Sequence, residues 1–215
     1  MPPKIKLSAS LIQCHNPLPV IGFIPILILC CLSSLAAQAQ TITFDIRLFN
    51  SSIGKMVLTR QQENDGTELY TLESNTKAKV LWITKIYHSS FEARYKNGIM
   101  ISCSHKENEN GNLKRWARVT LHNKVYQVES DHGTRTFTET PTTTDLSMYF
   151  QEATKLKRIF YLPDAEFNTL KWTDNKTAEF KSSDGHRNVY NLENGQIQSM
   201  EFHLALATVF MIREK

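Results

Sequence analysis

The sequence predicts an all-β domain with one short helix, in which about ten strands form an antiparallel meander. Residues 41–48 alternate strictly between apolar and polar side chains, which is typical of a half-buried strand. Asn-Gly and Asp-Gly pairs recur along the chain, and they favour tight hairpins because both residues tolerate a positive φ. Only one segment has the period of an amphipathic helix. These three observations together predict consecutive β-hairpins.

Residues 1–39 are predicted to be a signal peptide. Lys4 and Lys6 precede an apolar run over 18–32, and the small residues Ala37 and Ala39 flank Gln38 as at a signal-peptidase site. Cleavage after Ala39 would place the protein in the periplasm or outside the cell.

Two other fates of the leader have different consequences. The run 18–32 could be retained as a membrane anchor, but Pro19 and Pro25 interrupt it and it is shorter than the roughly 20 residues of a spanning helix. Cys30 or Cys31 could carry a lipid, although neither follows a small residue. Contact with a membrane is therefore expected only if the leader is uncleaved or lipidated.

The remaining chain, residues 40–215, is predicted to be a single antiparallel β domain. Removing 39 of the 215 residues leaves 176, enough to bury a substantial core. Cys103 is then the only cysteine, so no internal disulfide can form. The formal net charge falls from +4 to +2 with the loss of Lys4 and Lys6, which gives no argument for nucleic acid as a partner.

The strands follow in order from residue 41. The first places Ile42, Phe44 and Ile46 on one face, and a turn over 50–54 leads to a strand over 55–60. Further turns are predicted at Asp65-Gly66, Asn97-Gly98, Asn110-Gly111, His132-Gly133, Asp184-Gly185 and Asn194-Gly195.

Two segments, 79–95 and 196–213, contain no turn signal and predict strands of about 50 Å at roughly 3.3 Å per residue. A domain of this size accommodates such strands only if the sheet is strongly curved, so we expect a half-barrel or open barrel. In the second segment one apolar face is predicted to comprise Met200, Phe202, Leu204, Leu206, Phe210 and Ile212. The opposite face is apolar too, so another element must cover it.

The helix is predicted over 145–153. Leu146, Tyr149 and Phe150 form one apolar stripe with Ala153, and Asp145 can cap the N-terminus. A helix this short is marginal alone and needs packing, so we expect it against the concave face of the sheet.

Any concavity that the helix leaves unfilled is either side-chain core or a cavity for an apolar or amphiphilic molecule such as a lipid. The candidate ligand-binding residues are Trp82, Tyr149, Phe150 and His203. His203 shares a strand face with Glu201, and the two form either a solvent-facing pair or a polar contact within the cavity.

The pattern resembles an uncharacterised family of secreted β-proteins from Gram-negative bacteria of the Bacteroidetes group. The resemblance rests on turn and packing signatures: Ile53-Gly54, Tyr95-Lys96-Asn97-Gly98, Leu146-Ser147-Met148-Tyr149-Phe150 and Tyr190-Asn191-Leu192-Glu193-Asn194-Gly195. The family has no known function to transfer. The strand order is also similar to that of periplasmic half-barrels that carry lipids, an analogy of fold alone.

No catalytic residue, metal ligand or cofactor is predicted. Cys103 and His105 share a strand face with Ile101, so Cys103 is expected in the core and His105 at the strand end. Side chains two apart on a strand are about 7 Å apart at the backbone, too far for direct proton transfer. The histidines lack metal-binding spacing.

A basic and aromatic face is predicted at 114–118. Lys114, Trp116 and Arg118 alternate onto one side, while Leu113 and Ala117 mark the opposite, apolar side. Such a face is either a cross-strand surface cluster or a contact for an anion, a glycan or another protein.

The sequence therefore favours an exported, non-enzymatic β-module that binds an apolar or amphiphilic ligand in a curved sheet. The alternative is an envelope structural or interaction protein that meets another protein or a glycan through the basic and aromatic face. A hydrolase using Cys103 is the least favoured class.

Overall fold

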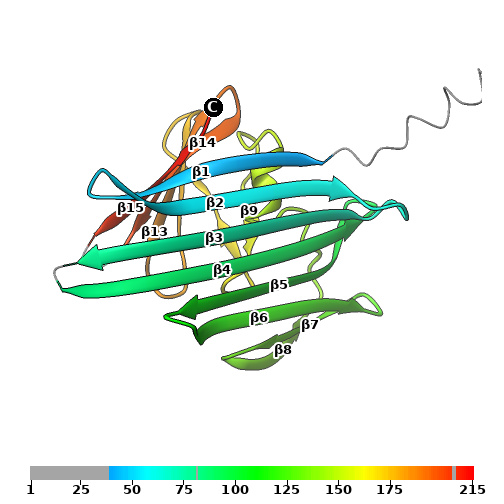
Figure 1. The fold of residues 1–215 in the computed structure, drawn as a ribbon. Helices are drawn as coiled ribbons and strands as arrows, with labels where there is room; N and C mark the ends of the chain where they lie inside the picture. Colours follow the sequence, from blue (N-terminus) through cyan, green and yellow to red (C-terminus); the bar gives the residue numbers. More distant parts are fainter. Residues whose placement is uncertain (1–38, 81, 205–206) are drawn as a thin grey trace, which may run out of the picture. The chain divides into compact units, whose positions relative to one another are not determined.

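The computed structural model describes residues 39–80, 82–204 and 207–215 (Figure 1). They form a sheet of 13 strands, a separate two-stranded hairpin and one four-residue 3₁₀ helix. The all-β prediction is therefore confirmed. The predicted leader falls on residues outside the described ranges, apart from residue 39.

The first eight strands form a meander in which each strand pairs antiparallel with the next. They are β1 (Gln40–Leu48), β2 (Ser51–Gln62), β3 (Glu68–Val80), β4 (Ile83–Lys96), β5 (Ile99–Glu109), β6 (Asn112–His122), β7 (Val125–Ser130) and β8 (Gly133–Phe137). Asn97-Gly98 and Asn110-Gly111 form the turns expected of them, with positive φ at all four residues.

The C-terminal strands extend the same sheet on the other side of β1. They are β11 (Lys171–Trp172), β12 (Thr177–Lys181), β13 (Arg187–Glu193), β14 (Gln196–His203) and β15 (Thr208–Arg213). Because β15 pairs with β1, the order runs β11-β12-β13-β14-β15-β1 and then through β2 to β8 (Figure 1). The edge strands β11 and β8 do not pair with each other in the described chain.

The turn predicted over 50–54 is shorter than expected. Phe49 and Asn50 both have positive φ and reverse the chain, so Gly54 lies inside β2. A Cβ atom at Gly54 would lie 1.9 Å from the carbonyl oxygen of Asn75 on β3. Glycine is therefore required at this position because the backbones of β2 and β3 approach so closely.

Both predicted long strands are wrong, because each contains a chain reversal. The segment 79–95 divides between β3 and β4, and 196–213 divides between β14 and β15. The reversal also shifts the alternation of side chains. Met200 and Met211 are paired and pack in or against the core, whereas Phe210 and Ile212 are 36% and 41% exposed. The single apolar face predicted for 200–212 is therefore wrong.

The segment between β8 and β11 packs against one face of the sheet. It contains the hairpin of β9 (Arg158–Tyr161) and β10 (Glu166–Thr169) and the helix η1 (Ser147–Phe150). The ring of Tyr149 lies 5.5 Å from that of Phe44 on β1 and 6.4 Å from that of Tyr190 on β13. These contacts pack η1 against the centre of the sheet.

The predicted helix over 145–153 is wrong in length and type. Thr144 and Ser147 cap each other: each backbone N–H donates to the other's hydroxyl, at 2.9 and 3.0 Å. The carboxylate of Asp145 instead accepts the N–H of Leu162 at 3.2 Å. The backbone is extended at Gln151, and the Ala153 N–H donates to the β13–β14 turn, so the helix ends after one turn.

Candidate functional site

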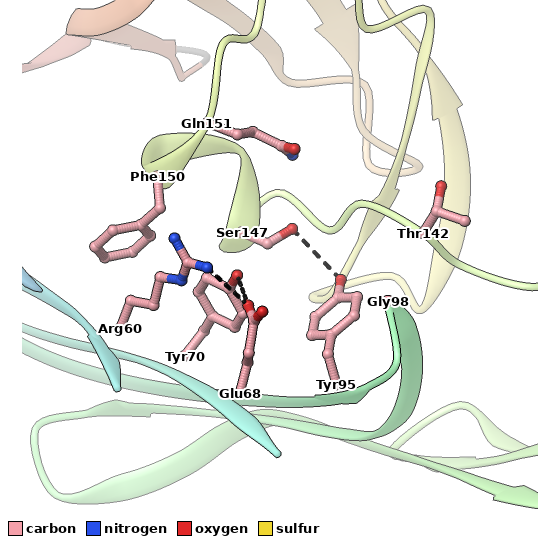
Figure 2. Close-up of a pocket in the computed structure, with 9 residues that line it drawn as sticks. All are labelled: Arg60, Glu68, Tyr70, Tyr95, Gly98, Thr142, Ser147, Phe150 and Gln151. Atoms are coloured by element: carbon pink, nitrogen blue, oxygen red, sulfur yellow. Dashed lines mark hydrogen bonds and ion pairs between the residues drawn. The ribbon is translucent and has the colours of Figure 1, made fainter. Parts of the chain in front are cut away.

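A pocket of about 220 Å³ opens where the C-terminal end of β2 meets η1 (Figure 2). Its walls come from β2, β3, β4, the β4–β5 turn and the segment that leads into and out of η1. The lining residues are Arg60, Glu68, Tyr70, Tyr95, Gly98, Thr142, Ser147, Phe150 and Gln151. Polar groups and aromatic rings from distant parts of the chain thus share one small volume.

One wall is a hydrogen-bonded group of three side chains. The Oε2 atom of Glu68 accepts from the Tyr70 hydroxyl at 2.5 Å and from the Arg60 guanidinium at 3.2 Å. The guanidinium also lies 5.7 Å from the centre of the Tyr70 ring. Burial and the Glu68 hydrogen bond raise the pKa of Tyr70, so its hydroxyl stays protonated. This wall carries one positive and one negative charge.

A second part of the lining presents hydroxyl groups. The Tyr95 hydroxyl lies 3.4 Å from that of Ser147 (Figure 2). The Ser147 hydroxyl also donates to the carbonyl of Thr144 at 3.3 Å. Burial raises the pKa of Tyr95 to about 12. The ring of Phe150 lies 5.6 Å from that of Tyr70 and completes an apolar wall. The pocket can therefore bond a small polar group while aromatic faces cover it.

The pocket residues of β2 and β3 were missed from the sequence. Arg60 and Tyr70 are paired in the β2–β3 register, and Glu68 lies two residues from Tyr70 on the same strand face. The Asp65-Gly66 turn predicted between them was the signal that could have revealed this pairing.

The four predicted ligand-binding residues lie in different places. Phe150 lines the pocket, whereas Tyr149 is buried in the core beside it. His203 lines a second, more open cavity of about 440 Å³ with His186 and Asp184, and Trp82 is 82% exposed between β3 and β4. The structure does not bring these four side chains together.

Cys103 is buried, as predicted, and His105 is only 2% exposed, so the expectation that His105 emerges at a strand end is wrong. The imidazole stacks on Phe91 with ring centres 4.3 Å apart. Burial raises the pKa of the Cys103 thiol and lowers that of His105 to about 4. Both groups are neutral at pH 7, and a neutral thiol is a weak nucleophile.

A charge cluster around the buried carboxylate of Asp164 lies on the same face of the sheet as His105. Arg115 on β6 contacts Asp164 in the β9–β10 turn at 2.6 Å and Asp184 after β12 at 3.6 Å. The side chain of Asp164 is 2% exposed and also accepts the N–H of Ser183 at 2.7 Å. Sequence reasoning missed Arg115, although it lies between Leu113 and Ala117 on the predicted apolar side.

The predicted basic and aromatic face lies on β6. Lys114 and Arg118 are exposed and Trp116 is half-buried. The register between β5 and β6 shifts at Lys114, which breaks the alternation there. Leu113 is consequently 55% exposed, so its predicted place on the apolar side is wrong.

The described part of the chain contains no group of three or more His, Cys, Asp or Glu side chains placed to hold a metal ion. Its helical residues include no stretch with the length and hydrophobicity to cross a bilayer.

Comparison with known proteins places this fold in a family. Residues 44–214 match the family described as Domain of unknown function (DUF6134). The chain belongs to this family. The matched region runs from β1 to the residue after β15, so the DUF6134 domain is the whole described sheet with its packed segment.

A solved structure supports the architecture of the DUF6134 domain. It is the crystal structure of a beta-barrel-like protein of domain of unknown function DUF1849 from Brucella abortus, with a TM-score of 0.54 and 12% sequence identity. The similarity covers 84% of this chain and 98% of the other, and at this identity it concerns the fold alone. No protein of curated function matches the chain.

Proposed function

We propose that this DUF6134 domain is an exported, non-enzymatic module that binds a small amphiphilic molecule and holds its polar group in the pocket of Figure 2. One observation carries the proposal: hydrogen-bonding groups of Arg60, Glu68 and Ser147 converge between aromatic rings in a single pocket. Ligand sites are commonly such concave, largely aromatic pockets with a few convergent polar groups.

The size and charge of the pocket restrict the ligand. A volume of about 220 Å³ is below the roughly 300–1,000 Å³ of most sites for drug-sized molecules, so only part of such a ligand enters. The charges of Arg60 and Glu68 offset each other at 3.2 Å. We therefore propose an uncharged or zwitterionic polar group, such as a sugar or a neutral lipid headgroup, with the apolar part outside.

The proposal includes a strongly curved sheet with η1 on its concave side. Arg115 and Asp184 lie 3.6 Å apart, yet β6 is eight positions from β13 in the sheet order. Strands spaced by roughly 4.8 Å would separate these residues by about 40 Å in a flat sheet. A half-barrel or open barrel accounts for the contact, and the buried segment between β8 and β11 fills much of its interior.

Native mass spectrometry of the protein purified from a Gram-negative host tests this function. We expect a bound small molecule on the wild type, its loss in Arg60→Gln, and its retention in the control Arg47→Gln. Arg47 is a suitable control because its ion pair with Asp45, at 2.6 Å, lies outside the pocket. Wild-type protein that carries no small molecule, and gains none from a lipid and glycolipid extract, would contradict the proposal.

Export is a separate part of the proposal and has its own test. The residue-39 boundary adjoins the start of β1 at Gln40, so cleavage there would leave the sheet intact. We expect the accumulated protein to begin at Gln40, as N-terminal sequencing would show, and to fractionate with the periplasm or the medium of a bacterium of the Bacteroidetes group. An uncleaved N-terminus in the cytoplasm would contradict export.

A second candidate function is binding of an envelope protein or a glycan through Lys114, Trp116 and Arg118. Within the described chain, Arg118 has no ion pair and Lys114 approaches Glu109 only at 4.0 Å. Cations beside an aromatic ring can bind anionic or sugar groups. If Trp116→Ala combined with Arg118→Ala leaves every cross-linked partner unchanged, this face has no such function.

A further inference from the structure

The end of the β3–β4 hairpin projects from the domain with both of its faces exposed. Trp82 is 82% exposed, Ile83 is 53% exposed and Ile86 is 50% exposed. Ile83 and Ile86 lie on opposite faces of β4, so the described residues cover neither face. Exposed apolar side chains gathered in one place commonly mark an interaction site.

Two neighbouring hairpins add apolar side chains at the same end of the sheet. Phe49 in the β1–β2 turn is 72% exposed and Leu113, which follows the β5–β6 turn, is 55% exposed. Strand pairing places all three hairpin ends on one side, at the left of Figure 1. We call Phe49, Trp82, Ile83, Ile86 and Leu113 the tip patch.

The three hairpin ends that carry the tip patch contain more lysines than acids. The three hairpin ends, residues 48–53, 77–87 and 109–114, contain four lysines and a single acid, Glu109. Glu109 contacts Lys85 at 2.7 Å and Lys114 at 4.0 Å. Lys77 and Lys79 have no ion pair in the described part of the protein. This balance complements a negatively charged partner.

The hairpin ends are also held in place before any partner binds. The backbone N–H of Ile86 donates to the side-chain oxygen of Asn110 at 3.0 Å, and the Asn110 N–H donates to the carbonyl of Ile86 at 2.8 Å. These two bonds fix the β3–β4 hairpin to the β5–β6 turn. A preorganised surface loses less conformational entropy on binding than a flexible one.

We propose that the tip patch docks on the surface of an anionic lipid bilayer. Tryptophan prefers the interface between headgroups and acyl chains, and lysines are attracted to anionic lipids. Trp82 and Phe49 would enter this interface while Lys77 and Lys79 contact lipid phosphates. The inference is independent of the proposed ligand pocket, which lies at the opposite end of β2 and β3.

Vesicles containing phosphatidylglycerol and brominated phosphatidylcholine provide the test, because bromine quenches tryptophan only at close range. We expect the protein to be quenched in these vesicles and the quenching to be lost in Trp82→Phe, which keeps an apolar side chain. The loss of quenching in this variant assigns the signal to Trp82, because the other two tryptophans, Trp116 and Trp172, are unchanged in it.

Binding strength gives the second measurement. We expect Trp82→Ser to weaken partitioning into anionic vesicles about tenfold and Lys77→Glu with Lys79→Glu to weaken it by more than about tenfold, an effect that falls as salt rises. Ile99→Ser is the matched control, because Ile99 is 42% exposed at the opposite end of the sheet and should change nothing.

Three outcomes would overturn the proposal. One is the absence of Trp82-dependent quenching with anionic vesicles. Another is quenching that survives reversal of both lysine charges. The third is self-association: a dimer in light scattering that Trp82→Ser dissolves, with no lipid binding, would assign the tip patch to a second copy of the chain.

Discussion

The two ends of the long strands β2 to β5 differ in chemistry. At the pocket end, Arg94 contacts Glu63 at 2.7 Å and Lys96 contacts Asp65 at 3.1 Å across adjacent turns. At the other end, the corresponding turns carry the exposed side chains of the tip patch. Both ends belong to the same strands, so formation of this sheet does not require apolar side chains at its turns. The exposed apolar side chains at the tip end are those that the proposed docking requires, whereas ion pairs hold the turns at the pocket end.

The comparison predicts different costs for glycine substitutions at the two ends. Gly54→Ala near the tip end should lower the free energy of unfolding by more than about 3 kcal/mol, because the new Cβ meets the backbone of β3. Gly66→Ala at the pocket end should cost about 1 kcal/mol, since its φ of +81° is strained but the space is open. Urea denaturation measures both. Equal losses would show that the close approach at Gly54 is not tight.

The ion pair of Arg115 with the buried Asp164 should contribute more to the free energy of unfolding than the Arg94–Glu63 pair at the pocket end. Arg115→Met leaves the buried Asp164 carboxylate without its cation, and we expect a loss of about 3 kcal/mol. Adding Asp164→Leu should restore part of it. Arg94→Gln should cost less than about 1 kcal/mol because both partners of its ion pair are about a third exposed. A larger loss in Arg94→Gln than in Arg115→Met would reverse this ranking.

Interior and exposed carboxyl groups should also differ in their response to pH. Burial raises the pKa of Asp145 to about 7, whereas the Thr67 N–H and Lys96 lower that of Asp65 to about 2. A raised carboxyl pKa stabilises the fold at low pH, and this contribution is lost as the pH rises from about 4 to about 7.

Asp145→Asn should therefore be relatively more stable than the wild type at pH 7 than at pH 4, by on the order of 2 kcal/mol. Asp65→Asn should show the opposite trend: its contribution is present above pH 4 and is lost as the pH falls toward 2. Thermal unfolding across this pH range separates them. The same trend in both variants would contradict the assigned environments. Burial lowers the pKa of His105 to about 4, so this residue makes the fold less stable as the pH falls from 6.5. The effect is the same in the wild type and in both variants, so it does not alter the comparison between them.

The smallest effect on stability is expected in the tip patch itself. Trp82→Ser should leave the free energy of unfolding within about 0.5 kcal/mol of the wild type, because the side chain is 82% exposed and packs on little. Thermal denaturation checks this directly. A substantial loss would mean that Trp82 is a folding residue and would weaken the comparison between the two ends.

The sequence was most informative where local backbone chemistry determines structure. Asn97-Gly98 and Asn110-Gly111 were predictable as turns because few other residue pairs adopt two positive φ values. The sequence just before Ile83 lacks glycine, proline and asparagine, so no local pattern predicts the chain reversal there. The helix ended early because Ser147 bonds Thr144 and the chain then bonds the β13–β14 turn, contacts that periodicity does not contain.

The candidate site was less predictable than the fold. Phe150 was found because it follows the apolar stripe around Tyr149, but Arg60, Glu68 and Tyr70 depend on the register of a hairpin. The charge cluster of Arg115 is formed with Asp164 and Asp184, which lie 49 and 69 positions further along the chain. Contacts at such separation follow from the three-dimensional fold and have no local sequence signal.

The pairing of β1 with β15 sets the order in which the sheet can be completed. β1 is synthesised before every other described strand, whereas β15 is synthesised after all of them. β1 therefore keeps one unpaired edge until β15 has emerged from the ribosome, and closing so long a loop is slow. During that interval the free edge of β1 can pair with another strand, so the late synthesis of β15 makes the incomplete sheet prone to mispairing.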